Sequence, residues 1–178
     1  MKNKDIILLA NEIRYFSREV AKSLAIMTRD KLYEDMDNII TKFYKHYPNP
    51  LYYKRHIVDG GIGGNVKRSF KKYYMSSHET TYSGGISLSP EWMEDIYNNQ
   101  RKNNRVSTDY IFNLIYAGYH GNIGMLPWEI NNIPPVMNPG PWELILRKRD
   151  NLVKNAQKNG DLIINKIKKN GKYSFISW

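Results

Sequence analysis

The chain has 178 residues, a mass of 21.0 kDa, 41% hydrophobic residues and a formal net charge of +10. This length suffices for a single domain with its own hydrophobic core, and the hydrophobic fraction excludes general disorder. Cysteine is absent, which excludes disulfides, thiolate nucleophiles, Fe–S clusters and zinc ribbons. No stretch is apolar for long enough to span a membrane.

The positive charge is uneven, with a net of +2 over residues 1–50 and +8 over residues 51–178. A basic surface favours nucleic acid, an anionic membrane or acidic protein neighbours. The excess is equally typical of chains rich in Lys, Asn, Ile and Tyr together, and both interpretations stay open. The opening 1-MKNKDIILLANEIRYF-16 turns polar too soon for a signal peptide, so we expect a protein that assembles in the cytoplasm.

Residues 4–46 are predicted to form a long amphipathic helix. Its apolar positions recur at alternating steps of three and four: Ile6, Leu9, Ile13, Phe16, Val20, Leu24 and Met27, then Leu32, Met36, Ile39, Ile40 and Phe43. The pattern stutters at 28-TRDK-31, where we expect a break, and it ends before Pro48. A straight helix of this length would be about 60 Å long, so it must bend back or pack against another subunit.

Residues 51–121 are predicted to be mainly antiparallel strands with one short helix. Aromatic and β-branched residues alternate with glycine pairs, and 86-ISLSP-90 follows the pair at Gly84-Gly85 with the alternation of a half-buried strand. Pro90 and early acids predict a short helix over 91–100. The apolar segment that begins 110-YIFNLIYAGYHG-121 fits a strand or a helix equally well.

Residues 122–141 contain five prolines and are predicted to form a long irregular loop of functional or intersubunit use. Pro141 suits a helix start, and an amphipathic helix is expected over 142–169, with Gly160 as its point of interruption. The segment 172–178 is predicted to be a terminal strand. The sequence therefore predicts one α+β domain in which two main helices pack on an antiparallel sheet.

The segment 67-KRSFKKYY-74 interleaves cations with aromatic side chains, the combination that contacts phosphates and bases. Its cations Lys67, Arg68, Lys71 and Lys72 are candidate contacts for DNA or an acidic partner. On a strand the aromatic and basic residues would not separate by face, which favours a basic edge strand. The preceding glycine run lacks the spacing of a phosphate-binding loop.

His120, in 116-YAGYHG-121, is the residue with most claim to catalysis. Gly118 and Gly121 permit unusual backbone conformations. No histidines share a helical face, and no acid pair or nucleophile elbow accompanies His120. We therefore expect no enzyme activity, no metal and no cofactor, with a hydrolase or nuclease as the weakest alternative. Tyrosine and tryptophan favour interfaces, so the candidate assembly residues are Tyr116, Tyr119, His120, Trp128 and Trp142.

The order of elements resembles the small tail-completion and tail-terminator (neck) proteins of tailed bacteriophages. Those proteins begin with a long amphipathic helix, followed by a basic, Gly-rich link like 54-KRHIVDGGIGGNVKRSF-70 and by antiparallel strands. An aromatic–Gly turn then enters a Pro-rich loop, as in 127-PWEINNIPPVMNPGPW-142, before a final helix. The resemblance covers most of the chain in layout, although the Arg-Thr-Gly-x-Leu run of those proteins is absent.

The resemblance implies a structural virion subunit in a hexameric or dodecameric ring at the head–tail junction. It implies no catalysis and no membrane. Its partners would be other phage neck and tail proteins, with non-specific DNA contact in the lumen of the ring. The alternative is a small basic nucleic-acid-binding protein.

Overall fold

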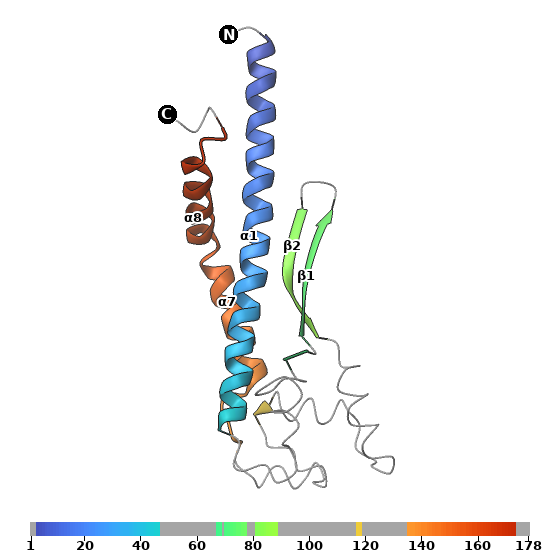
Figure 1. Ribbon diagram of the computed structural model, residues 1–178, viewed down its shortest axis with the longest axis vertical. Coiled ribbons are helices and arrows are strands. Elements are labelled where there is room, and N and C mark those ends of the chain that lie inside the picture. The colour runs from blue at the N-terminus through green and yellow to red at the C-terminus, as the bar shows by residue number, and fades with distance from the viewer. Residues whose placement is uncertain are drawn as a thin grey trace. The chain divides into compact units, whose positions relative to one another are not determined.

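The computed structural model describes residues 3–46, 67–68, 70–77, 81–88, 117–118 and 135–173. Over these residues the fold is α+β (Figure 1). Its elements in chain order are α1 (Asn3–Lys45), β1 (Phe70–Ser77), β2 (Thr81–Leu88), α7 (Pro141–Lys154) and α8 (Ala156–Lys169). The predicted long N-terminal helix and antiparallel strands are confirmed. The predicted helix at 91–100 and the part of the Pro-rich loop before residue 135 lie outside the described residues.

The chain divides into two compact units, and α1 contributes to both. The first unit contains residues 1–31, 72–85 and 150–178, and the second contains residues 32–71 and 86–149. The division within α1 falls directly after 28-TRDK-31, where the apolar pattern stutters. The helix itself runs on without interruption, so the expected break at this point is wrong. The stutter marks a change of packing partners, because a helix can present a new face without breaking its backbone hydrogen bonds.

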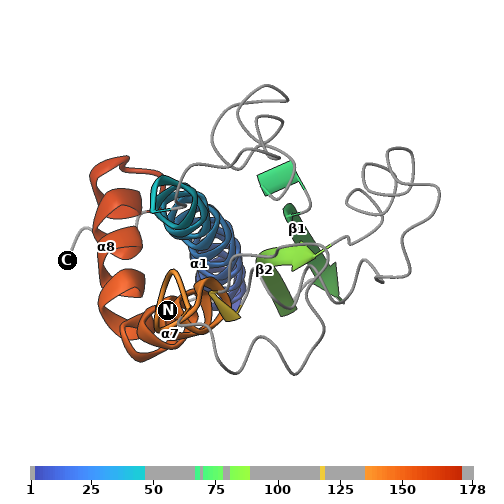
Figure 2. The same ribbon diagram turned by 90° about the horizontal axis from the view of Figure 1, so that it is seen from below.

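In the first unit, α8 lies on one side of α1 and the β1–β2 hairpin on the other (Figures 1 and 2). The sequence explains the α8 contact, because both helices carry apolar residues at steps of three and four. Ile163, Ile167 and Tyr173 form the buried cluster. The part of the predicted α1 stripe that packs against this cluster consists of Phe16, Val20, Leu24 and Met27.

Gly84 allows the hairpin to approach α1 closely. A Cβ atom at this position would lie 2.1 Å from the carbonyl oxygen of Ala25, which no side chain tolerates. The neighbouring Gly85 lies under the ring of Tyr73. Both glycines lie inside β2. The alternation of residues 86–90 had indicated a strand that begins after them.

The second unit buries the C-terminal part of α1. Met36, Ile40 and Phe43 are fully enclosed, and Phe70 at the start of β1 and Ile145 of α7 are also buried. An ion pair of 3.8 Å between Lys148 and Asp35 joins α7 to α1 in this unit.

The predicted C-terminal helix is two helices, and they separate at Asn155 rather than at Gly160. The side-chain amide of Asn155 donates a 2.7 Å hydrogen bond to the carbonyl oxygen of Asn151. The backbone amide of Asn155 keeps its helical hydrogen bond to the same carbonyl oxygen, at 3.0 Å. The two helices are therefore separated by a change of backbone angles, since Asn155 has a φ of −97° and a ψ of 13°. Gly160 lies inside α8, and a Cβ atom there would meet nothing within 4 Å. Pro141 is the first residue of α7, as predicted.

The predicted terminal strand over 172–178 is not found in its two described residues. Lys172 and Tyr173 follow α8 in irregular backbone, and the ring of Tyr173 meets Phe16 of α1 edge-on, with centroids 5.4 Å apart. An aromatic side chain that packs on a neighbouring helix needs no strand to bury it. Residues 174–178 lie outside the described residues.

Candidate functional site

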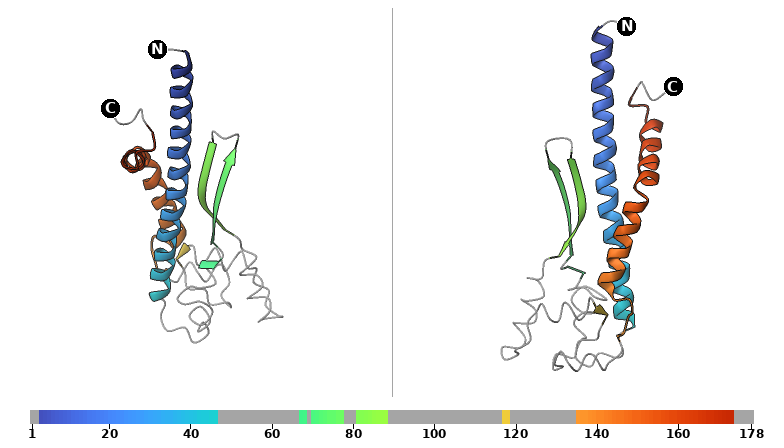
Figure 3. Two further views of the ribbon diagram at one scale, coloured as in Figure 1. Left: turned by 45° about the horizontal axis from the view of Figure 1, so that its top comes forward. Right: turned by 180° about the vertical axis from the view of Figure 1, so that it is seen from behind.

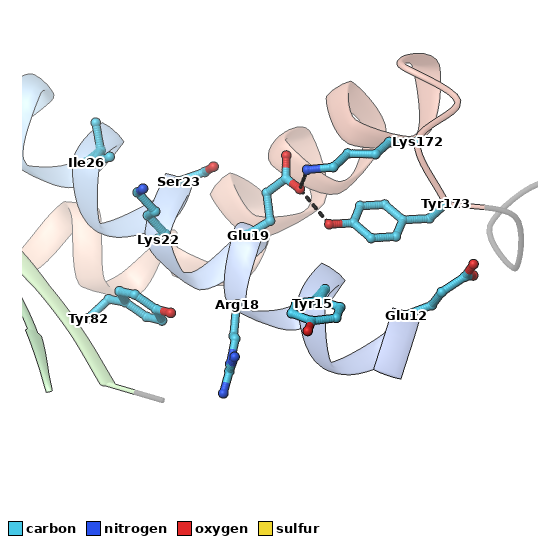
Figure 4. Close-up of a pocket in the computed structure, with 10 residues that line it drawn as sticks. All are labelled: Glu12, Tyr15, Arg18, Glu19, Lys22, Ser23, Ile26, Tyr82, Lys172 and Tyr173. Atoms are coloured by element: carbon cyan, nitrogen blue, oxygen red, sulfur yellow. Dashed lines mark hydrogen bonds and ion pairs between the residues drawn. The ribbon is translucent and has the colours of Figure 1, made fainter. Parts of the chain in front are cut away.

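An open groove of about 680 Å³ runs along α1 in the first unit, and we name it the α1 groove (Figure 4). It is lined by Glu12, Tyr15, Arg18, Glu19, Lys22, Ser23 and Ile26 of α1, Tyr82 of β2, and Lys172 and Tyr173. Tyr82 lies toward the Ile26 end, and Lys172 and Tyr173 lie toward the Glu12 end.

The floor of the groove follows from helix periodicity. Glu12, Tyr15, Glu19, Lys22 and Ile26 are spaced by three and four residues in turn, which places them along one face of α1. This face differs from the apolar stripe that contacts α8. The first stripe was evident from its hydrophobic residues, whereas this second stripe mixes charge, tyrosine and isoleucine. Reading the same spacing without regard to polarity would have found it.

Glu19 accepts two short hydrogen bonds in the groove. Its Oε2 atom accepts hydrogen bonds from the Nζ of Lys172 at 2.7 Å and from the hydroxyl of Tyr173 at 2.6 Å. The Lys172 hydrogen bond, followed by that of Tyr173, lowers the pKa of Glu19. The bond to Glu19 raises the pKa of Lys172. Burial first, and then the bond to Glu19, raises the pKa of Tyr173.

These shifts describe a structural anchor better than an acid–base pair. A carboxylate whose pKa is lowered binds protons weakly and is a poor general base near neutral pH. Lys172 and Tyr173 hold their protons more firmly than usual and therefore are poor general acids. The three groups tie the segment after α8 to α1 and leave the rest of the α1 groove open.

The lysine and arginine residues that were predicted to contact DNA or an acidic partner have different surroundings in the structure. Lys67 lies in a short helical turn and pairs with Asp37 at 2.8 Å. Lys72 lies on β1 and pairs with Asp30 at 2.9 Å. Arg68 and Lys71 are exposed. Nucleic-acid contact through Lys67 and Lys72 would therefore compete with acidic groups of α1.

The pairing of these lysines with acidic residues of α1 was not predicted from the sequence. The segment 30-DKLYEDMD-37 carries four acids on two helical turns, and three of them bind lysines from later in the chain, namely Lys72, Lys148 and Lys67. The hydrogen bond from Lys72 is the largest cause that lowers the pKa of Asp30. The available signal was charge complementarity between this segment and 67-KRSFKK-72.

Most of the predicted assembly residues lie outside the described residues: Tyr116, Tyr119, His120 and Trp128. Trp142 is exposed in the first turn of α7. Gly118, for which the sequence predicted an unusual backbone conformation, has a φ of 90°. Its carbonyl oxygen accepts a 3.1 Å hydrogen bond from the amide of Met137, which lies within the Pro-rich segment.

A second candidate surface lies at the start of α1, where the helix projects beyond α8 and the hairpin (Figure 3). Ile7 and Leu8 are 60% and 64% exposed. The other exposed apolar side chains of this surface, which we call the N-terminal surface, are Ile6, Leu9, Ile13 and Tyr15. Ile6, Leu9 and Ile13 continue the stripe that α8 covers further along the helix. Exposed apolar side chains in this number make the start of α1 a candidate docking surface.

Comparisons with protein families, curated proteins and solved structures give no match to this chain. Among the described helices, none is long and apolar enough to cross a membrane. Over the same parts of the chain, His, Asp and Glu residues form no group that could hold a metal ion.

Proposed function

We propose that this protein is a structural subunit that acts by assembling with copies of itself and with neighbouring proteins. The observation that carries the proposal is the N-terminal surface of α1. Six large apolar or aromatic side chains are exposed between Ile6 and Tyr15, on a helix whose following turns are covered by α8. Covering such a surface stabilises a complex by about 25 cal/mol for each Å² of apolar area removed from water.

The narrower form of the proposal is a virion subunit in a hexameric or dodecameric ring at the head–tail junction of a tailed bacteriophage. It is supported by the layout of a long N-terminal helix, an antiparallel hairpin and C-terminal helices after a proline-rich segment. A ring needs two complementary surfaces on each subunit. The N-terminal surface is one candidate, and the exposed Trp142 belongs to the other. Neck and tail proteins would be its neighbours.

The proposal assigns no catalytic role to the α1 groove. Its central carboxylate, Glu19, already binds Lys172 and Tyr173, and its lowered pKa makes it a weak base.

Light scattering after size exclusion, combined with electron microscopy, tests the proposal. We expect particles whose mass is a multiple of 21.0 kDa and whose images show rings. Ile6→Glu, at a residue that is 49% exposed, should weaken association by about tenfold or more because it places a charge on the interface. Val153→Glu is the matched control, since Val153 is 67% exposed on α7. A wild-type protein that stays at 21.0 kDa, alone and in phage lysate, would contradict the proposal.

A further inference from the structure

We infer that the α1 groove binds the α1 helix of a second copy of this chain, in antiparallel orientation about a two-fold axis near Ser17. This inference rests on the proposed function and names the partner of one assembly surface. The proposed contact uses one face of α1 in one register, and both follow from the order of residues along the helix.

The floor of the groove, extended by one step to Leu8, has the spacing of a coiled-coil seam. Leu8, Glu12, Tyr15, Glu19, Lys22 and Ile26 follow one another at steps of four and three, the spacing of the a and d positions of a heptad. The seam spans about 27 Å at 1.5 Å per residue. Leu8 and Tyr15 are exposed on it, and the groove that contains Glu12 to Ile26 is open.

The seam is complementary to itself when the second helix runs in the opposite direction. Positions equally far from Ser17 then face one another, so that Leu8 meets Ile26 and Glu12 meets Lys22. Tyr15 meets Glu19, a carboxylate that already accepts a hydrogen bond from a tyrosine hydroxyl in the structure. The apolar residues of one helix therefore face apolar residues of the other, and Glu12 faces the oppositely charged Lys22. Each pair occurs twice, because both copies use the same surface in the contact.

The seam extends by one step at each end to residues of opposite charge. Asp5 lies three residues before Leu8, Arg29 lies three residues after Ile26, and the two are equally far from Ser17. No two like charges fall on such equidistant positions between residues 3 and 31. Like charges across a helix pair are destabilising, so the sequence favours this register.

A parallel pair would place Glu12 against Glu12 and Lys22 against Lys22, which disfavours it. A two-fold contact does not close a cyclic ring, but it joins two rings face to face. The inference therefore fits the dodecameric form of the proposed assembly.

Charge reversal tests the register. Glu12→Lys turns two attractive contacts into two repulsive ones and should weaken the two-fold pair by about tenfold, as measured by the midpoint of dissociation in analytical ultracentrifugation. Lys22→Glu should do the same, and the double variant Glu12→Lys with Lys22→Glu should return to the wild-type midpoint. Additive weakening in the double variant would overturn the inference.

Cross-linking gives a second readout that does not depend on the strength of the ion pairs. Since the chain has no cysteine, Leu8→Cys and Ile26→Cys each introduce one thiol. A short bismaleimide should link the mixture of the two variants and neither variant alone. Linkage of Leu8→Cys with itself would show a parallel pair, and efficient linkage of Tyr15→Cys with Ile26→Cys would show a displaced register; either result would overturn the inference.

The two proposals fail in different ways. Particles larger than 21.0 kDa without this cross-link would overturn the antiparallel contact and leave the assembly proposal intact. A strictly monomeric chain would overturn both.

Discussion

The two parts of α1 present the same kind of apolar pattern to different surroundings. Between Leu32 and Phe43 the apolar residues are enclosed within the second unit. Between Ile6 and Ile13 they are exposed, although Ile6, Leu9 and Ile13 continue the stripe that α8 covers from Phe16 to Met27. The comparison teaches that a helical stripe identifies an apolar face but does not by itself show whether the rest of the chain covers that face.

Truncation of a buried residue in the second part of α1 should have the largest effect on stability. Phe43 is fully enclosed, so Phe43→Ala should lower the free energy of unfolding by about 3–5 kcal/mol. Ile6→Ala at the exposed end should change it by less than about 0.5 kcal/mol at a concentration that keeps the protein monomeric. Urea unfolding of both variants measures the difference, and similar losses would break the comparison.

Gly84 offers a smaller test, directed at the hairpin that covers part of the first unit. Gly84→Ala would drive a methyl group into the carbonyl of Ala25 and should cost about 1–3 kcal/mol. Thermal unfolding monitored by circular dichroism measures this loss. An unchanged melting temperature would mean that β2 does not approach α1 as closely as described.

Gly160→Ala is the matched control for Gly84→Ala, and its expected effect on stability has the opposite sign. Gly160→Ala should stabilise the protein by about 0.5–1 kcal/mol, because alanine loses less backbone freedom in a helix and the new methyl group meets open space. A loss of stability in the same thermal assay would show that α8 is not regular at this point.

The smallest expected effect is the pH dependence of the Glu19 anchor. Because hydrogen bonds lower the folded pKa of Glu19 below its ordinary value of 4.5, its contribution to stability is complete above pH 4.5. It is lost as the pH falls through the lowered pKa. Glu19→Gln should therefore flatten the fall in stability below pH 4.5, as followed by urea unfolding at several acidic pH values. An unchanged acid slope would show that the anchor adds nothing.

Much of the fold could be predicted from the sequence, because strong periodicity and proline positions act locally. The helix before Pro48, the start of α7 at Pro141 and the covered stripe from Phe16 to Met27 all rest on such signals. The separation at Asn155 was missed because it is a change in the backbone angles of one residue, which no apolar pattern marks. The continuity of α1 through 28-TRDK-31 was missed because a change of packing partner looks like a break in a hydrophobic pattern.

The candidate site could be predicted less well, because it depends on contacts between distant segments. The lysines of 67-KRSFKK-72 suggested a polyanion site, but Lys67 and Lys72 bind acids of α1 that lie about 30 to 40 residues earlier. The stripe that forms the floor of the α1 groove mixes charged, aromatic and apolar residues, so a search for apolar periodicity does not find it. That this face of the helix is an open groove appears only from the positions of Tyr82, Lys172 and Tyr173.

Hydrogen exchange of the α1 amides at low and high protein concentration tests the central claim most directly, namely that the N-terminal part of this helix is an assembly surface. We expect the amides of residues 6–15 to exchange quickly in dilute protein and to become protected as concentration rises. The amides of residues 36–43 should stay protected at both concentrations, since they lie in the core of the second unit. Exchange of residues 6–15 that is equally fast at both concentrations would contradict the account.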